Sequence, residues 1–161
     1  MDVRPLPAAD LPAAEVLLDD LLAGRRQARL GEVHDVLALA ALGVWDRGRL
    51  VGLATWAGAG GDGRAELAAL AVAEDRRGRG VGAALVEAVA GAARTDGATT
   101  LWLVTTNDNL DALRLYQRHG FRLVDLHAGS VDAARAAGAP IPATGAYGVP
   151  LRDELVLERA L

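Results

Sequence analysis

A strand pattern, a glycine-rich turn and an amphipathic helix follow one another directly near the middle of the chain, and this order constrains the fold most. Arg64–Val72 has the composition of a strand. From Val81 to Ala92, apolar residues recur at i, i+3, i+4, i+7, i+8 and i+11, which predicts a helix from about Gly80 to Arg94. A strand that leads straight into a helix indicates an α/β fold.

The turn between this strand and this helix has the composition of an anion-binding loop. Its sequence is Arg76-Arg77-Gly78-Arg79-Gly80-Val81-Gly82. Glycines let an anion approach the backbone, a helix start adds positive potential, and arginines supply forked donors. We predict a pyrophosphate-binding loop, with a solvated arginine-rich turn as the alternative. A Walker loop would need Gly-Lys-Ser/Thr, and the dinucleotide spacing Gly-x-Gly-x-x-Gly is not matched.

The remaining patterns surround this segment with further strands and helices. We expect strands at Val3–Leu6, Gly43–Asp46, Arg49–Ala57, Thr99–Thr105, Phe121–Leu126 and Leu151–Glu158. We expect helices at Asp10–Leu22, at Asn109–His119 and, on weaker grounds, at Glu32–Ala40. Arg25–Leu30 is expected to be a loop, and Gly129–Gly148 to be mostly irregular. The order predicts a mixed sheet that is parallel around Thr99–Thr105.

Length, charge and cysteine content exclude several classes of function. With 161 residues, one domain over residues 1–161 is expected. The absence of cysteine excludes disulfides, zinc–thiolate sites and a cysteine nucleophile. A net charge of −4 argues against nucleic acid or an anionic membrane as partner. The first residues lack the pattern of a signal peptide, so we expect a cytoplasmic protein.

Two motifs identify a family resemblance. Arg77-Gly78-Arg79-Gly80-Val81-Gly82 resembles the Arg/Gln-x-x-Gly-x-Gly/Ala signature of the GCN5-related N-acetyltransferase (GNAT) superfamily. Asn109-x-x-Ala112-x-x-x-Tyr116-x-x-x-Gly120-Phe121 is similar to that family's second motif, and the order matches. The resemblance covers Arg49–Val124 closely. It implies the GNAT fold: a central mixed, mostly antiparallel sheet with a splayed parallel strand pair and flanking helices.

The resemblance further implies that acetyl-CoA is the cosubstrate, with no metal. Its pantetheine arm would fill the gap between Glu66–Val72 and Thr99–Thr105, and its pyrophosphate would lie on the amides of Arg77–Ala83. The implied cofactor-binding residues are Leu70, Ala71, Val72, Arg77, Gly78, Arg79, Gly80, Val81, Gly82, Ala83, Asn109 and Tyr116. Because lysine is absent, Arg76, Arg77 and Arg79 are the side chains available for phosphate.

For catalysis, the resemblance implies Tyr116 as the general acid that protonates the leaving thiolate. A phenol with a pKa of about 10 keeps its proton at neutral pH. Glu66 is the candidate general base, and His127 is a rival for that role. The alternatives are an aromatic packed on the sheet for Tyr116, a solvent-facing glutamate for Glu66 and a structural histidine for His127. Without a cysteine, the amine would attack directly in a ternary complex.

The expected function is therefore transfer of an acetyl group to a primary amine on a small molecule or a peptide. A non-catalytic acyl-CoA sensor on the same fold is the first alternative, and an unrelated nucleotide-phosphate binder is the second. The family usually shapes its acceptor pocket in the region of Leu126–Arg152. Acids there could attract an amine, whereas Arg135 or Arg152 could hold a carboxylate. A homodimer is one option, since dimers are common in the family.

Overall fold

The computed structural model describes residues 1–161, and its main feature is a seven-stranded sheet. The strand order is β1-β4-β5-β6-β7-β9-β8. The bounds are β1 Val3–Pro5, β4 Ala40–Asp46, β5 Arg49–Ala57, β6 Arg64–Val72, β7 Thr100–Thr106, β8 Arg122–His127 and β9 Glu154–Ala160. Neighbouring strands are antiparallel except for β6 and β7. This arrangement confirms the predicted fold class.

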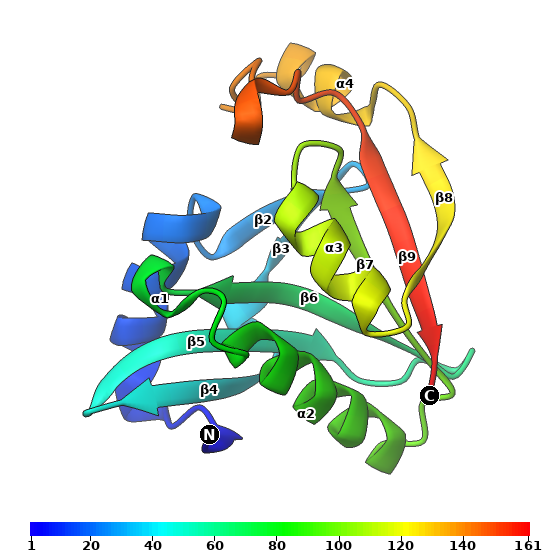
Figure 1. Cartoon of the computed structure of the whole chain (residues 1–161). Coiled ribbons are helices and arrows are strands. Elements are labelled where there is room, and N and C mark those ends of the chain that lie inside the picture. Colours follow the sequence, from blue (N-terminus) through cyan, green and yellow to red (C-terminus); the bar gives the residue numbers. More distant parts are fainter.

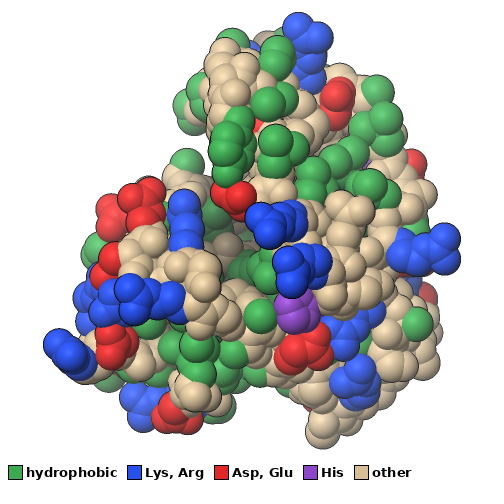
Figure 2. Space-filling view, viewed as in Figure 1, with side chains coloured by type: hydrophobic (Ala, Val, Ile, Leu, Met, Phe, Trp, Pro, Cys, Tyr) green, Lys and Arg blue, Asp and Glu red, His purple; other side chains and the backbone are tan.

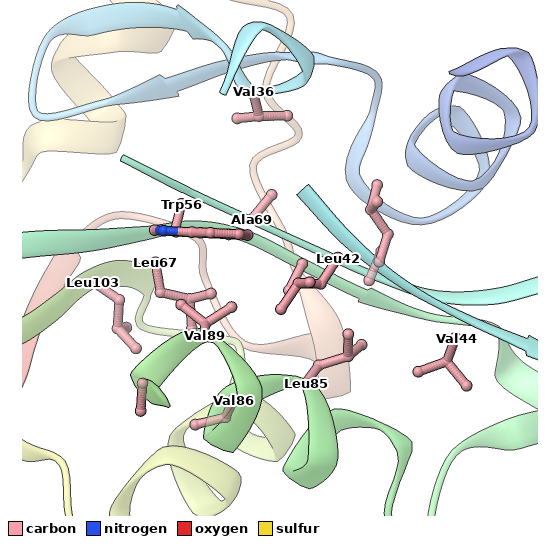
Figure 3. Close-up of a cluster of buried hydrophobic side chains, with 14 of the residues drawn as sticks. Val36, Leu42, Val44, Trp56, Leu67, Ala69, Leu85, Val86, Val89 and Leu103 are labelled. Carbon is pink, nitrogen blue, oxygen red and sulfur yellow. The ribbon is translucent and has the colours of Figure 1, made fainter. Parts of the chain in front are cut away.

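Four α-helices flank the sheet: α1 Leu11–Leu22, α2 Val81–Thr95, α3 Leu110–Arg118 and α4 Ser130–Ala136. Short 3-10 segments lie at Ala8–Asp10, Val36–Ala38, Glu74–Arg76 and Ala146–Gly148. Figure 1 shows α2 and α3 on the near side of the sheet and the N-terminal elements on the far side. The core lies on both faces, with Val36 on one and Val86 and Val89 of α2 on the other (Figure 3). Because strand and helix periodicities are local signals, most predicted elements are present within a few residues of their expected ends.

The main departure from the prediction lies between α1 and β4. Two strands, β2 Arg26–Arg29 and β3 Glu32–Asp35, form a separate hairpin there. The helix predicted at Glu32–Ala40 and the loop predicted at Arg25–Leu30 are both wrong. The turn residues Leu30 and Gly31 have φ values of 49° and 80°. Two successive positive φ angles suit a tight hairpin turn, but Leu-Gly is not one of the residue pairs that signal it in a sequence.

Strand β8 forms one edge of the sheet and is exposed along most of its length. Leu123, Val124 and Leu126 are each about half exposed, at 51%, 49% and 56%. The expected homodimer stays a prediction.

No helix of the structure combines the length and the apolar character that crossing a bilayer would need.

Candidate active site

The parallel strands β6 and β7 separate after a short paired stretch. They pair only from Arg64 with Thr100 to Glu66 with Trp102. Beyond this point β6 stays paired with β5, and β7 stays paired with β9. The facing edges from Leu67 onward therefore carry backbone polar groups that no strand satisfies, and an extended ligand with amide groups can pair with such an edge.

A β-bulge marks the beginning of this splay. Thr55 pairs with Ala69 while Trp56 pairs with Leu67, so Ala68 is an extra residue in β6. A bulge bends its strand and changes the direction of the following side chains. Leu70, beyond the bulge, lies close to the start of α2: a methyl group added at Gly82 would be 4.0 Å from its Cδ2. The bulge thus helps β6 to leave β7 where the gap opens.

The turn after β6 presents a row of free backbone N–H groups. The six amides from Gly78 to Ala83 donate to no acceptor in the protein, and the first helical bond runs from Ala84 N to Gly80 O at 2.9 Å. Gly78 and Gly80 have φ values of 70° and 82°, a conformation that glycine adopts without strain. Together with the dipole of α2, this row forms a site for an anion. Figure 2 shows a hollow on this face with positively charged side chains on both sides.

The three arginines of the turn differ in their partners. Arg76 donates to Asp46 from Nε at 3.0 Å and from Nη2 at 2.5 Å, and its Nη1 lies 2.8 Å from Asp75. This guanidinium holds the pKa of Asp46 below its ordinary value. Arg77 is loosely held, with Nε 3.3 Å from the Val72 carbonyl. Arg79 is exposed and makes no ion pair. The expectation that Arg76 serves a phosphate is corrected, because its donors are occupied by Asp46 and Asp75.

Helix α3 carries Asn109 and Tyr116 to the same side of the sheet as α2. Asn109 stands at the N-cap position, but its side chain makes no capping bond and donates from Nδ2 to Thr105 Oγ1 at 3.2 Å. Leu115 approaches the start of α2, since a methyl group at Gly82 would lie 3.2 Å from its Cδ2. The Asn109 side chain is therefore held by the end of β7, while its backbone carbonyl accepts from Leu113 N of α3 at 3.0 Å.

Tyr116 is 7% exposed and its ring packs against Phe121, with centroids 5.6 Å apart. Burial raises the pKa of Tyr116 well above its ordinary value because the phenolate would lose its hydration. The side chain belongs to the hydrophobic core, so Tyr116 packs on the sheet as the alternative interpretation expected. A phenol in this environment keeps its proton at physiological pH, so the proton is present for donation.

The predicted base Glu66 forms a largely buried ion pair with Arg29 of β2. Arg29 Nη2 donates to Glu66 Oε2 at 2.9 Å, and Nε contacts Oε1. The side chains are only 9% and 12% exposed. Glu66 thus lies at the beginning of the splay, beside the gap in which the thioester is expected. Its carboxylate is nevertheless engaged by a cation that the sequence did not reveal.

The rival base, His127, lies on β8 beside a shallow cavity of about 330 Å³. Its Nε2 is 3.3 Å from Asp125 Oδ2, and its side chain is 41% exposed. The cavity is lined by Leu30, Asp62, Arg64, Trp102, Asp125, His127 and Val156. His119 is elsewhere, at the end of α3, with Nδ1 3.1 Å from Glu87 Oε1. Neither contact assigns a catalytic role.

The family model for the acetyltransferase (GNAT) family matches residues 11–121. The chain belongs to this family. A GNAT structure from Elizabethkingia anophelis with acetyl-CoA bound has the same fold, at TM-score 0.79 and 22% identity over 99% of this chain and 97% of that one.

Two curated relatives are similar over parts of their length. Streptothricin acetyltransferase of Streptomyces lavendulae is 34% identical over 124 residues, 77% of this chain and 64% of that protein. The uncharacterized protein YxbD of Bacillus subtilis is 40% identical over 83 residues, which is 52% of either protein. The match thus spans between half and two thirds of these relatives.

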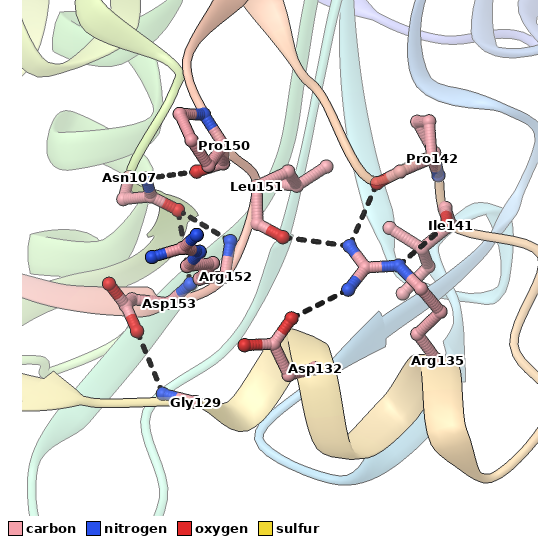
Figure 4. Close-up of polar contacts among 10 residues, drawn as sticks. All are labelled: Asn107, Gly129, Asp132, Arg135, Ile141, Pro142, Pro150, Leu151, Arg152 and Asp153. Carbon is pink, nitrogen blue, oxygen red and sulfur yellow. Dashed lines mark hydrogen bonds and ion pairs between the residues drawn. The ribbon is translucent and has the colours of Figure 1, made fainter.

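Within this GNAT chain, the long connection between β8 and β9 is held by its own polar groups (Figure 4). Arg135 donates to the carbonyls of Ile141, Pro142 and Leu151 and forms an ion pair with Asp132 at 2.7 Å. The suggestion that Arg135 holds a substrate carboxylate is therefore not supported by its surroundings.

Sequence reasoning missed two charged residues of the site, Arg29 and the buried Glu154 of β9. Glu154 is 7% exposed and accepts from the Leu30 N–H at 3.1 and 3.2 Å. Arg29 lies in a segment expected to be a loop. Glu154 has no local pattern that distinguishes it from the other acids of the chain. Only the fold brings these two residues to the splay.

Proposed function

We propose that this GNAT protein is an acetyl-CoA-dependent N-acetyltransferase that acts on a primary amine. The observation that carries the proposal is the combination of the β6–β7 splay with the row of free N–H groups from Gly78 to Ala83. A ligand with amides along an extended arm and a pyrophosphate at its end matches both features. The related structure that holds acetyl-CoA supports the same ligand.

The donor would be bound mainly by backbone groups. We propose that Leu70, Ala71 and Val72 offer the edge of β6 to the pantetheine amides. The turn and the first residues of α2 would hold the pyrophosphate, assisted by Arg77 and Arg79. Because Arg77 Nε lies 3.3 Å from the Val72 carbonyl, this guanidinium would have to shift when an amide takes that acceptor. Asn109 would contact the cofactor arm from the end of β7.

Acetyl-CoA supplies an activated acetyl group, and the protein supplies orientation and proton transfer. Tyr116 is proposed to protonate the leaving sulfur, because burial favours its neutral form. Glu66, at the beginning of the splay, is one candidate for the base, directly or through water, but Arg29 shares its carboxylate. The chain has no cysteine to form an acyl-enzyme, so the amine would attack the thioester directly.

The acceptor class is proposed as a primary amine on a small molecule or a peptide. The similarity to the streptothricin acetyltransferase of Streptomyces lavendulae favours small molecules as the first candidates. The acids near the acceptor side, such as Asp62 and Asp125 beside the cavity, are compatible with a positively charged amine.

The test is release of free thiol from acetyl-CoA in the presence of a panel of amines. We expect thiol release that depends on the amine. Acetyl-CoA at 100 times its Kd should add about 2.7 kcal/mol of stability. That corresponds to a rise in Tm of roughly 5–10 °C for a chain of this size. A rise in Tm with ATP or NAD but not with CoA would contradict the proposal. Binding of CoA without turnover on a broad panel would favour the sensor instead.

A further inference from the structure

The β2–β3 hairpin bridges the two sides of the splay on the face opposite α2. Arg29, at the end of β2, pairs with Glu66 on β6. The next residue, Leu30, donates its N–H to Glu154 on β9, beyond β7. Figure 1 shows the hairpin crossing behind the gap between β6 and β7. Glu66 and Glu154 thus both bond to the hairpin tip, one from β6 and the other from β9.

The charges in this group do not cancel. Arg29 balances Glu66, whereas Glu154 has no cation within 4 Å and only the Leu30 N–H as its donor. His127, its neighbour on β8, pairs with Asp125 instead. In addition, Nη1 of Arg29 is buried and has no hydrogen-bond partner. The protein's own groups therefore leave a buried carboxylate without a counter-charge, which is costly unless a proton or a cation compensates it.

We propose that Glu154 binds the ammonium group of the acceptor and takes the proton that makes the amine nucleophilic. This inference rests on the proposed function and specifies its acceptor as a protonated alkylamine. The N–H bond of the ammonium breaks and an O–H bond forms on Glu154, which gives a neutral amine and a neutral carboxylic acid. Glu154 later returns this proton to water. The second proton of the amine leaves as the amide forms, in balance with the proton that the sulfur receives.

Glu154 is better suited to this step than Glu66. A proton on Glu66 would leave the buried charge of Arg29 without its partner, which is a strongly unfavourable state. A proton on Glu154 removes an uncompensated charge and keeps an oxygen for the Leu30 N–H. Glu66 and Arg29 then act as positioning residues that hold the hairpin tip over Glu154.

The deciding experiment compares two acceptors of equal length, butylamine and O-propylhydroxylamine. Butylamine is protonated at neutral pH, whereas O-propylhydroxylamine is a much weaker base, is largely neutral and needs no base before attack. Glu154→Gln keeps an acceptor for the Leu30 N–H. It should lower kcat/KM for butylamine by roughly 100-fold or more, the usual contribution of general base catalysis. For O-propylhydroxylamine the loss should be less than about tenfold.

Glu158→Gln is the matched control, because Glu158 lies on the same strand and is a half-exposed partner of Arg64. It should leave the ratio between the two acceptors unchanged. Equal losses for both acceptors in Glu154→Gln would mean a structural role and would overturn the proposal. A selective loss in Glu66→Gln but not in Glu154→Gln would assign the base to Glu66.

A binding measurement keeps the proposal independent of turnover. Calorimetric titration with butylammonium chloride should detect binding to the wild-type protein and at least tenfold weaker binding to Glu154→Gln. No detectable binding to the wild type, or equal binding to both, would overturn the role of Glu154. A different result would contradict the proposed acetyl transfer itself, namely that the wild-type protein releases no thiol with any amine.

Discussion

Replacing Gly80 by alanine separates the conformational role of this glycine from a role in binding acetyl-CoA. Gly80 has a φ of 82°, and a methyl group there would meet no atom within 4 Å. The cost to stability is therefore conformational only, about 1–2 kcal/mol for an alanine in the left-handed region. For a domain of this size, each kcal/mol lowers the Tm by roughly 2–4 °C.

Gly97→Ala is a matched control at the other end of α2. Gly97 has a φ of 86°, is exposed, and also has no atom within 4 Å of an added methyl group. Both variants should lose similar stability. Only Gly80→Ala shifts the free amides between Gly78 and Ala83, so only this variant should bind CoA more weakly. One lost charge-assisted hydrogen bond is worth about 1.5–3 kcal/mol, which corresponds to about 10- to 140-fold in Kd.

The assay is a thermal melt of both variants combined with calorimetric titration of CoA. Equal Tm losses with a selective loss of CoA affinity in Gly80→Ala would support the reasoning. If CoA bound equally well to both variants, or equally poorly, the amide row would not be the phosphate site. A much larger loss of stability in one variant would show that the two positions are not conformationally equivalent.

Three further predictions test individual side chains. Arg76→Gln should lower the Tm but leave the KM for acetyl-CoA unchanged, whereas Arg79→Gln should raise that KM and leave the Tm unchanged. Tyr116→Phe should lower kcat at least tenfold with little change in Tm, since its hydroxyl has no partner in the protein; equal kcat would remove it as the acid. Arg159 and His119 lower the pKa of Glu87 from 4.5 to about 2, so the stability that Glu87 adds is complete above pH 4.5 and is lost as the pH falls toward 2. Acid titration of Glu87→Gln should lack this loss, which is at most about 1 kcal/mol because Glu87 is half exposed.

Local patterns were sufficient to predict the elements that carry the donor site. The expected strand at Arg64–Val72 has the same bounds as β6, and the helix expected at Gly80–Arg94 differs from α2 by one residue at each end. Both signals come from the spacing of apolar residues within the element itself. The positions of the glycines in the turn are likewise a local property, because a positive φ at Gly78 and Gly80 follows from the sharp change of direction.

The predictions that were wrong concern contacts between residues far apart in the sequence. The partner of Arg76 is Asp46, thirty positions earlier, which reaches it only because β4 lies in the same sheet. The contact between Leu30 and Glu154 spans 124 positions. No periodicity reports such pairs, and the hairpin that makes one of them was expected to be partly loop and partly helix. Long-range contacts therefore decide which charges are free, whereas local patterns decide only where they lie along the chain.

This distinction explains how two residues of one type can take different roles in the same site. Arg76 and Arg79 are three residues apart, but the Asp46 carboxylate occupies the first and leaves the second for an anion. On the other face of the sheet, the same holds for two acids. Glu66 is paired with Arg29, whereas Glu154 has no cationic partner and can bind a cation. The sheet thus offers unpaired positive groups on the side of α2 and an unpaired negative group under the hairpin. An anionic donor and a cationic acceptor would be drawn to opposite faces, and the splay between β6 and β7 is where they could meet.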